Sequence, residues 1–96
     1  MKYFHRTNLS PDAVLAMARS FFGSRLAPFE ETPRRFAYRG GLGKVSVSAK
    51  PEGGHYTLIQ VETDQVGESE LDRLAKRFLA EVHQMVEPAH AVRGAY

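Results

Sequence analysis

Cysteine is absent from this 96-residue chain. Without a thiol, the protein can form no disulfide and can bind no metal through a thiolate. Long apolar runs are absent as well. The first residues, Met-Lys-Tyr-Phe-His-Arg, turn polar at once, and no apolar run approaches the roughly eighteen residues of a membrane span. We therefore expect neither a signal peptide nor a membrane helix, and we expect a cytoplasmic protein.

The motifs of the common enzyme and cofactor classes are also missing. The sequence contains no phosphate loop, dinucleotide fingerprint or nucleophile elbow. Glycines 40, 41 and 43 precede a strand rather than a helix, which favours a hairpin turn over a phosphate site. The histidines at 5, 55, 83 and 90 lack the spacing of a helical zinc pair. We predict no metal and no cofactor, and nothing in the sequence argues for an enzyme.

What the chain contains is ordinary for one globular domain spanning residues 1–96. It is 43% hydrophobic and 25% charged, values typical of a folded protein of this size. Scarce Asn and Gln, with plentiful Arg, Glu, Ala and Pro, suit a thermophilic bacterial source.

The net charge of +2 is unevenly distributed: residues 1–50 carry nine Lys/Arg against three acids, and residues 51–96 carry four against eight. This asymmetry indicates either an anion-binding face or two solvated surfaces of opposite sign, which could meet within the fold or across a dimer.

The clearest structural signal is a hairpin over residues 43–63. Val45, Val47 and Ala49 alternate with polar residues, as in a half-buried antiparallel strand. Pro-Glu-Gly-Gly at 51–54 predicts the turn. Residues 56–63, apolar on both faces, predict a central strand.

Two more strands are expected, over residues 2–9 and 34–39. The segment 25–33 contains two prolines and adjacent glutamates, and predicts a loop or a short irregular edge strand.

Two helices complete the pattern. Ser10-Pro11-Asp12 is typical of a helix start, and an apolar stripe continues to Gly23. Near the other end, Ser69 and Asp72 fit a capping box. An amphipathic stripe follows and ends or kinks at Pro88, so we expect a flexible tail over 89–96.

These elements predict an α+β two-layer sandwich in the order strand-helix-strand-strand-strand-helix. The first strand should lie beside residues 56–63, in a four-stranded antiparallel sheet with both helices on one face. The other face would carry Lys44, Ser46, Ser48 and Lys50, uncovered by any helix. An open four-stranded sheet also has two exposed edge strands, which favour pairing with another copy of the chain and so a homodimer.

The pattern resembles a known family at several points. These are a strand running into Leu9-Ser10-Pro11, the stretch from Pro33 to Tyr38, the hairpin, and the long final helix. Together they are similar to an abbreviated helix-grip domain of the START/polyketide-cyclase type. In that family a seven-stranded sheet wraps around a C-terminal helix and encloses apolar ligands. Here only about ten residues separate the first helix from Arg34, so the shortened pattern also resembles TATA-binding-protein-like domains.

Three functions follow as hypotheses. The leading one is a non-catalytic, dimeric binding module with a small apolar or anionic ligand between the final helix and the sheet. The residues expected to line that site are Phe36, Tyr38, Leu58, Leu71, Leu74, Phe78 and Val82. For these same residues, a closed core with no ligand is the favoured interpretation. The second is an interaction or scaffold protein whose partner docks on the exposed sheet edge or face.

The third hypothesis, ranked below the others, is nucleic-acid binding through the basic N-terminal half. Its candidate residues are Arg34, Arg35, Arg39, Lys44 and Lys50. Sheet-type readers interleave aromatic and basic side chains, and Phe36, Tyr38 and Tyr56 imitate that pattern. We expect those three aromatic side chains to face the helices instead.

Overall fold

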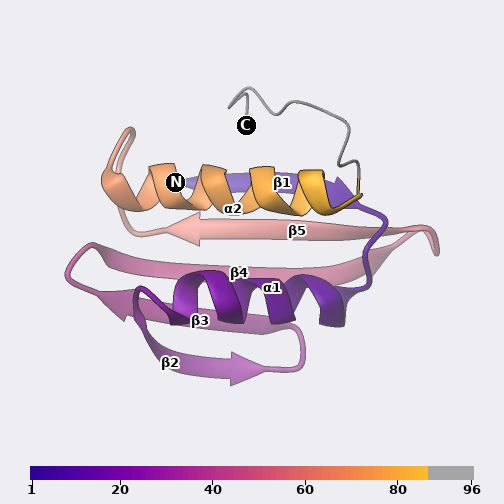
Figure 1. The fold of residues 1–96 in the computed structure, drawn as a ribbon, viewed down its shortest axis with the longest axis horizontal. Helices are drawn as coiled ribbons and strands as arrows, with labels where there is room; N and C mark the ends of the chain where they lie inside the picture. Colours follow the sequence, from indigo (N-terminus) through magenta and orange to yellow (C-terminus); the bar gives the residue numbers. More distant parts are fainter. Residues whose placement is uncertain (87–96) are drawn as a thin grey trace.

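Five strands and two helices follow one another in the order β-α-β-β-β-β-α (Figure 1). The computed structural model describes residues 1–86, so the predicted tail and His90 lie outside the described residues. The elements are β1 (Lys2–Thr7), α1 (Pro11–Gly23), β2 (Ala27–Thr32), β3 (Arg35–Gly40), β4 (Gly43–Glu52), β5 (Tyr56–Thr63) and α2 (Glu70–Val86). The predicted α+β class is confirmed, whereas the prediction of four strands is wrong.

The additional strand is β2, at one edge of the sheet. All neighbours are antiparallel in the order β1-β5-β4-β3-β2, so the predicted neighbours are kept and β2 extends them. Its pairing with β3 shifts by a bulge between Pro28 and Glu30. A proline and a bulge are tolerated at an edge, where half of the backbone groups need no partner strand. Of the two possibilities left open for this segment, the irregular edge strand is correct.

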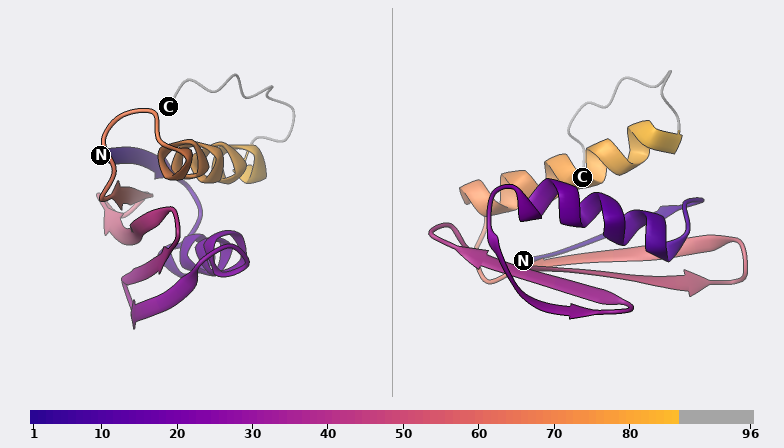
Figure 2. Two further views of the ribbon diagram at one scale, coloured as in Figure 1. Left: turned by 90° about the vertical axis from the view of Figure 1, so that its left-hand side faces the viewer. Right: turned by 60° about the horizontal axis from the view of Figure 1, so that its bottom comes forward.

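Both helices pack on the same face of the sheet (Figure 2), with α1 over β3 and β4, and α2 over β1 and β5. Ser10 caps α1 as predicted, since its Oγ accepts from the Ala13 amide at 3.1 Å. The predicted turn before β5 is also confirmed, with positive φ at Gly53 and Gly54. The face opposite the helices, which we call the outer face, is covered by no element of residues 1–86.

Gly43 begins β4 at a point where a side chain would not fit. Its φ is +123°, and a Cβ there would lie 2.5 Å from Asp64 Oδ1. The missing side chain lets Asp64 approach and accept the Lys44 amide at 2.9 Å. The start of β4, just after the β3–β4 turn, is thereby tied to the end of β5.

Candidate functional site

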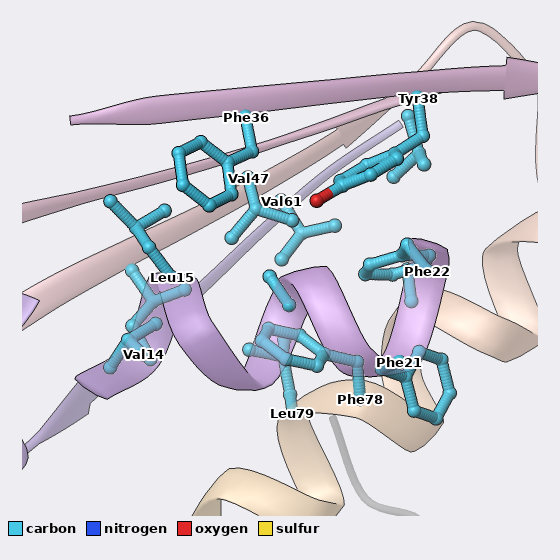
Figure 3. Close-up of a cluster of buried hydrophobic side chains, with 14 of the residues drawn as sticks. Val14, Leu15, Phe21, Phe22, Phe36, Tyr38, Val47, Val61, Phe78 and Leu79 are labelled. Carbon is cyan, nitrogen blue, oxygen red and sulfur yellow. The ribbon is translucent and has the colours of Figure 1, made fainter. Parts of the chain in front are cut away.

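The space between α2 and the sheet, where a small ligand was expected, is filled by side chains (Figure 3). Of the seven residues predicted to line it, five are buried in the core: Phe36, Tyr38, Leu71, Phe78 and Val82. Leu74 is partly buried against them. Leu58 is placed on the outer face by the alternation of β5, opposite Arg6 and Lys50. The prediction that all seven share one site is therefore wrong for Leu58, and the others form a closed core.

One polar atom interrupts that core. The Tyr38 hydroxyl is buried and has no hydrogen-bond partner within residues 1–86. Burial raises the pKa of this phenol, and the charge of Glu31 adds to the rise, while Arg19 opposes it. The ring stacks on Phe22 with centroids 6.0 Å apart. Tyr38 is thus a neutral, packed side chain, and the cavities found in the described residues lie elsewhere.

The outer face is organised in rows that cross the strands. One row runs from β1 through β5 and β4 to β3, because the register pairs Phe4 with Gln60, Gln60 with Ser48, and Ser48 with Arg35. Small and polar side chains form its centre, so the middle of the face is flat. Larger side chains stand toward its two ends.

Three aromatic side chains on this face are open to solvent. Phe4 is 58% exposed, Tyr56 53% and Phe29 45%. Phe4 lies on the edge strand β1 and Phe29 on the opposite edge strand β2, so the face carries aromatic rings near both of its edges rather than one apolar patch. The expectation that Phe36 and Tyr38 face the helices is confirmed. For Tyr56 it is wrong, because the side chains of β5 that face the helices begin with Thr57, and Tyr56 points to the other face.

Basic side chains share this face. Four of the five predicted cations are on it, the exception being Arg34, which turns toward α1 and lies 3.8 Å from Asp12. Within the described residues Lys44 and Lys50 have no ion pair. Arg35 pairs with Glu30 at 2.6 Å. The guanidinium of Arg39 lies 5.3 Å from the centre of the Phe29 ring.

A shallow hollow of about 220 Å³ lies at the β2 side of this face. Ala37, buried although it lies on the outer face, forms the floor with Ser46. The surrounding side chains are Phe29, Arg35, Lys44, Glu62 and Asp64. The hollow thus combines one aromatic ring with positively charged donors and negatively charged acceptors of hydrogen bonds.

A buried carboxylate joins α2 to the edge strand β1. Asp72 is fully buried and accepts hydrogen bonds from Tyr3 Oη at 3.0 Å, Thr63 Oγ1 at 2.8 Å and Ser69 Oγ at 2.5 Å. Its amide donates to Ser69 Oγ at 3.1 Å, which confirms half of the predicted capping box. The other half differs, because the carboxylate binds hydroxyls rather than the Ser69 amide.

The pKa values of this cluster follow from its hydrogen bonds. Burial alone would raise the pKa of Asp72, but hydrogen bonds from Ser69, Thr63 and Tyr3 outweigh it and lower that pKa. Burial, and next the bond to Asp72, raise the pKa of Tyr3 to about 12. Asp72 is therefore an anion and Tyr3 a neutral donor at physiological pH. The cluster ties α2 to β1 and β5.

Two histidines distant in sequence meet at the other end of α2. The rings of His5 and His83 are 6.0 Å apart, edge to face. Burial lowers the pKa of His5, and the neighbouring His83 lowers it further. No group of three or more metal-ligating side chains is found in residues 1–86, so this pair forms no recognisable metal centre there.

The lowered pKa of His5 makes stability depend on pH. Because the folded pKa of His5 lies below its unfolded value of about 6.5, the unfolded chain binds more protons and stability falls as pH drops through about 6.5. We expect urea unfolding between pH 7.5 and 5 to show this loss, and His5→Gln to reduce it. His55→Gln, which removes an exposed imidazole from the β4–β5 turn, is the matched control. An identical acid loss in His5→Gln and the parent would contradict this account.

The sequence-based prediction found most of the cations but missed the arrangement around them. Phe4 and Phe29 were not singled out. Phe4 lies in an expected strand without a cleanly apolar face, and Phe29 lies in the segment predicted as a loop or an irregular edge strand. No helix in the described part of the chain is both long and apolar enough to span a membrane.

No protein-family model matches this chain, and no curated protein matches it in sequence.

Proposed function

We propose that this protein is a non-enzymatic binding protein and that its outer sheet face binds single-stranded nucleic acid. One observation carries the proposal: exposed aromatic rings and unpaired cations share the only sheet face that residues 1–86 leave uncovered. Bases stack on aromatic rings, and phosphates are attracted to basic side chains, so this combination suits an unpaired strand.

The shape of the face favours an unpaired strand over a duplex. Five strands at a spacing of about 4.8 Å give a face about 19 Å wide, wider than the roughly 12 Å major groove of B-DNA. Stacking on Phe4 or Phe29 also needs bases whose faces are free. A flat centre of Ser46, Ser48 and Gln60 lets the strand cross the sheet without a steric barrier.

The alternatives have weaker support. A small ligand between α2 and the sheet would need space that the core side chains occupy. A partner strand added to β2 would meet Pro28, a bulge and two glutamates, which protect an edge from pairing. A second copy packed on the outer face remains a competitor, and light scattering with and without oligonucleotide separates it, because a face-to-face dimer must dissociate when the strand binds.

A salt titration tests the proposal. Of the six basic side chains on the face, Lys2 and Arg6 lie on β1, and the other four are Arg35, Arg39, Lys44 and Lys50. If these last four contact phosphates, the logarithm of the binding constant falls against the logarithm of salt concentration with a slope of about −3 for a single strand. Fluorescence anisotropy with labelled twelve-nucleotide DNA and RNA measures it. No binding of either at low salt would refute the proposal.

A further inference from the structure

We propose that the hollow on the outer face receives one base and prefers bases with an exocyclic amino group to thymine or uracil. This inference rests on the proposed function, and names the specificity of the same surface. It places recognition in Glu62, which lines the hollow and is the cross-strand neighbour of Ser46.

The hollow has the size and lining that a single ring needs. Its volume of about 220 Å³ is below the roughly 300–1,000 Å³ of sites for drug-sized molecules. The small side chain of Ala37 leaves room at the floor, and the Phe29 ring supplies a wall for stacking. Arg39 lies against that ring, which fixes its position. Lys44 at the rim can meet the phosphate next to a bound base.

The hydrogen-bonding groups decide which base fits. Asp64 Oδ1 already accepts the Lys44 amide and Gln65 Nε2, each at 2.9 Å. Glu62, by contrast, has no hydrogen bond or ion pair to any residue in 1–86. A carboxylate only accepts hydrogen bonds. It would therefore bind the amino group of cytosine, adenine or guanine and repel the O4 acceptor of thymine or uracil.

Two oligonucleotides isolate this choice. Twelve-nucleotide oligo(dC) and oligo(dT) are both pyrimidine strands, and their bases present opposite hydrogen-bonding groups at C4. At pH 7.5 we expect oligo(dC) to bind about tenfold more tightly, as one discriminating base contact would give. Equal affinity, or tighter binding of oligo(dT), would overturn the inference and leave the proposed function standing. No binding of either would overturn both.

A matched pair of variants assigns the preference to Glu62. Glu62→Gln gives a side chain that both donates and accepts, so the ratio of the two affinities should fall from about tenfold toward one. Glu52→Gln removes the same charge from the same face, outside the hollow, where Glu52 pairs with Arg6. It should change both affinities together and keep their ratio. An unchanged ratio in Glu62→Gln would overturn the assignment.

Discussion

Replacing Asp72 with alanine is expected to lower the free energy of unfolding by about 4 kcal/mol. Losses of this size are typical when one partner is removed from a buried, charged hydrogen-bond network. Three hydroxyls, from Tyr3, Thr63 and Ser69, would lose their common acceptor. A domain of this size is stable by only about 5–15 kcal/mol, so the variant would be close to unfolding. Urea unfolding at pH 7 measures the loss, and thermal melting should show a fall of well over about 10 °C.

Two comparisons show whether the loss comes from this network. Glu70→Ala removes an exposed carboxylate from the same helical turn and should cost no more than about 1 kcal/mol. Acid provides the second comparison. Because the folded pKa of Asp72 lies below its ordinary value, its stabilisation is present at neutral pH and is lost as pH falls below about 3.8 through the folded pKa. If Asp72→Ala and Glu70→Ala cost the same, the network contributes no more than a surface charge.

The double substitution Phe4→Ala with Phe29→Ala is expected to weaken binding of a single strand by about a hundredfold. Each stacked base contributes about 1–3 kcal/mol, and tenfold in affinity corresponds to about 1.4 kcal/mol. Both rings are exposed, so stability should change far less than affinity. Anisotropy titrations at one salt concentration, with circular dichroism melting of the same samples, separate the two effects.

The control is Met85→Ala, which removes an exposed apolar side chain from α2, on the helical side of the molecule. It should leave affinity unchanged. Affinity that survives the double substitution, or falls equally in Met85→Ala, would place the binding surface elsewhere.

Much of the fold could be predicted because its signals are local. The cap at Ser10, the glycines of the β4–β5 turn and the stripe of α2 each depend on a few neighbouring residues, and all three are confirmed. The edge strand β2 was left open because its proline and bulge weaken the period-two pattern. The segment forms a strand because it pairs with β3, and this tertiary contact cannot be read from the local sequence pattern.

The candidate surface was harder to predict because a face is assembled from several strands. Whether Phe4 meets Gln60, and Gln60 meets Ser48, depends on the register, which shifts every side chain to the opposite face when it slips by one residue. The alternation within one strand predicted that Lys44 and Lys50 share a face, but not which side chains of other strands lie beside them. The meeting of His5 with His83 and the acceptor role of Asp72 depend on how α2 docks on β1, which no spacing in the sequence encodes.

The central claim is that the outer sheet face, and not the space under the helices, is the binding surface. Nuclear magnetic resonance of ¹⁵N-labelled protein, titrated with a twelve-nucleotide single strand, tests this most directly. We expect the largest amide shift changes along all five strands, including Phe4, Phe29, Gln60, Ser48 and Arg35, with the buried residues of α1 and α2 nearly unmoved. Shifts concentrated on the helices and the core around Phe78, or no shifts at all, would contradict the account.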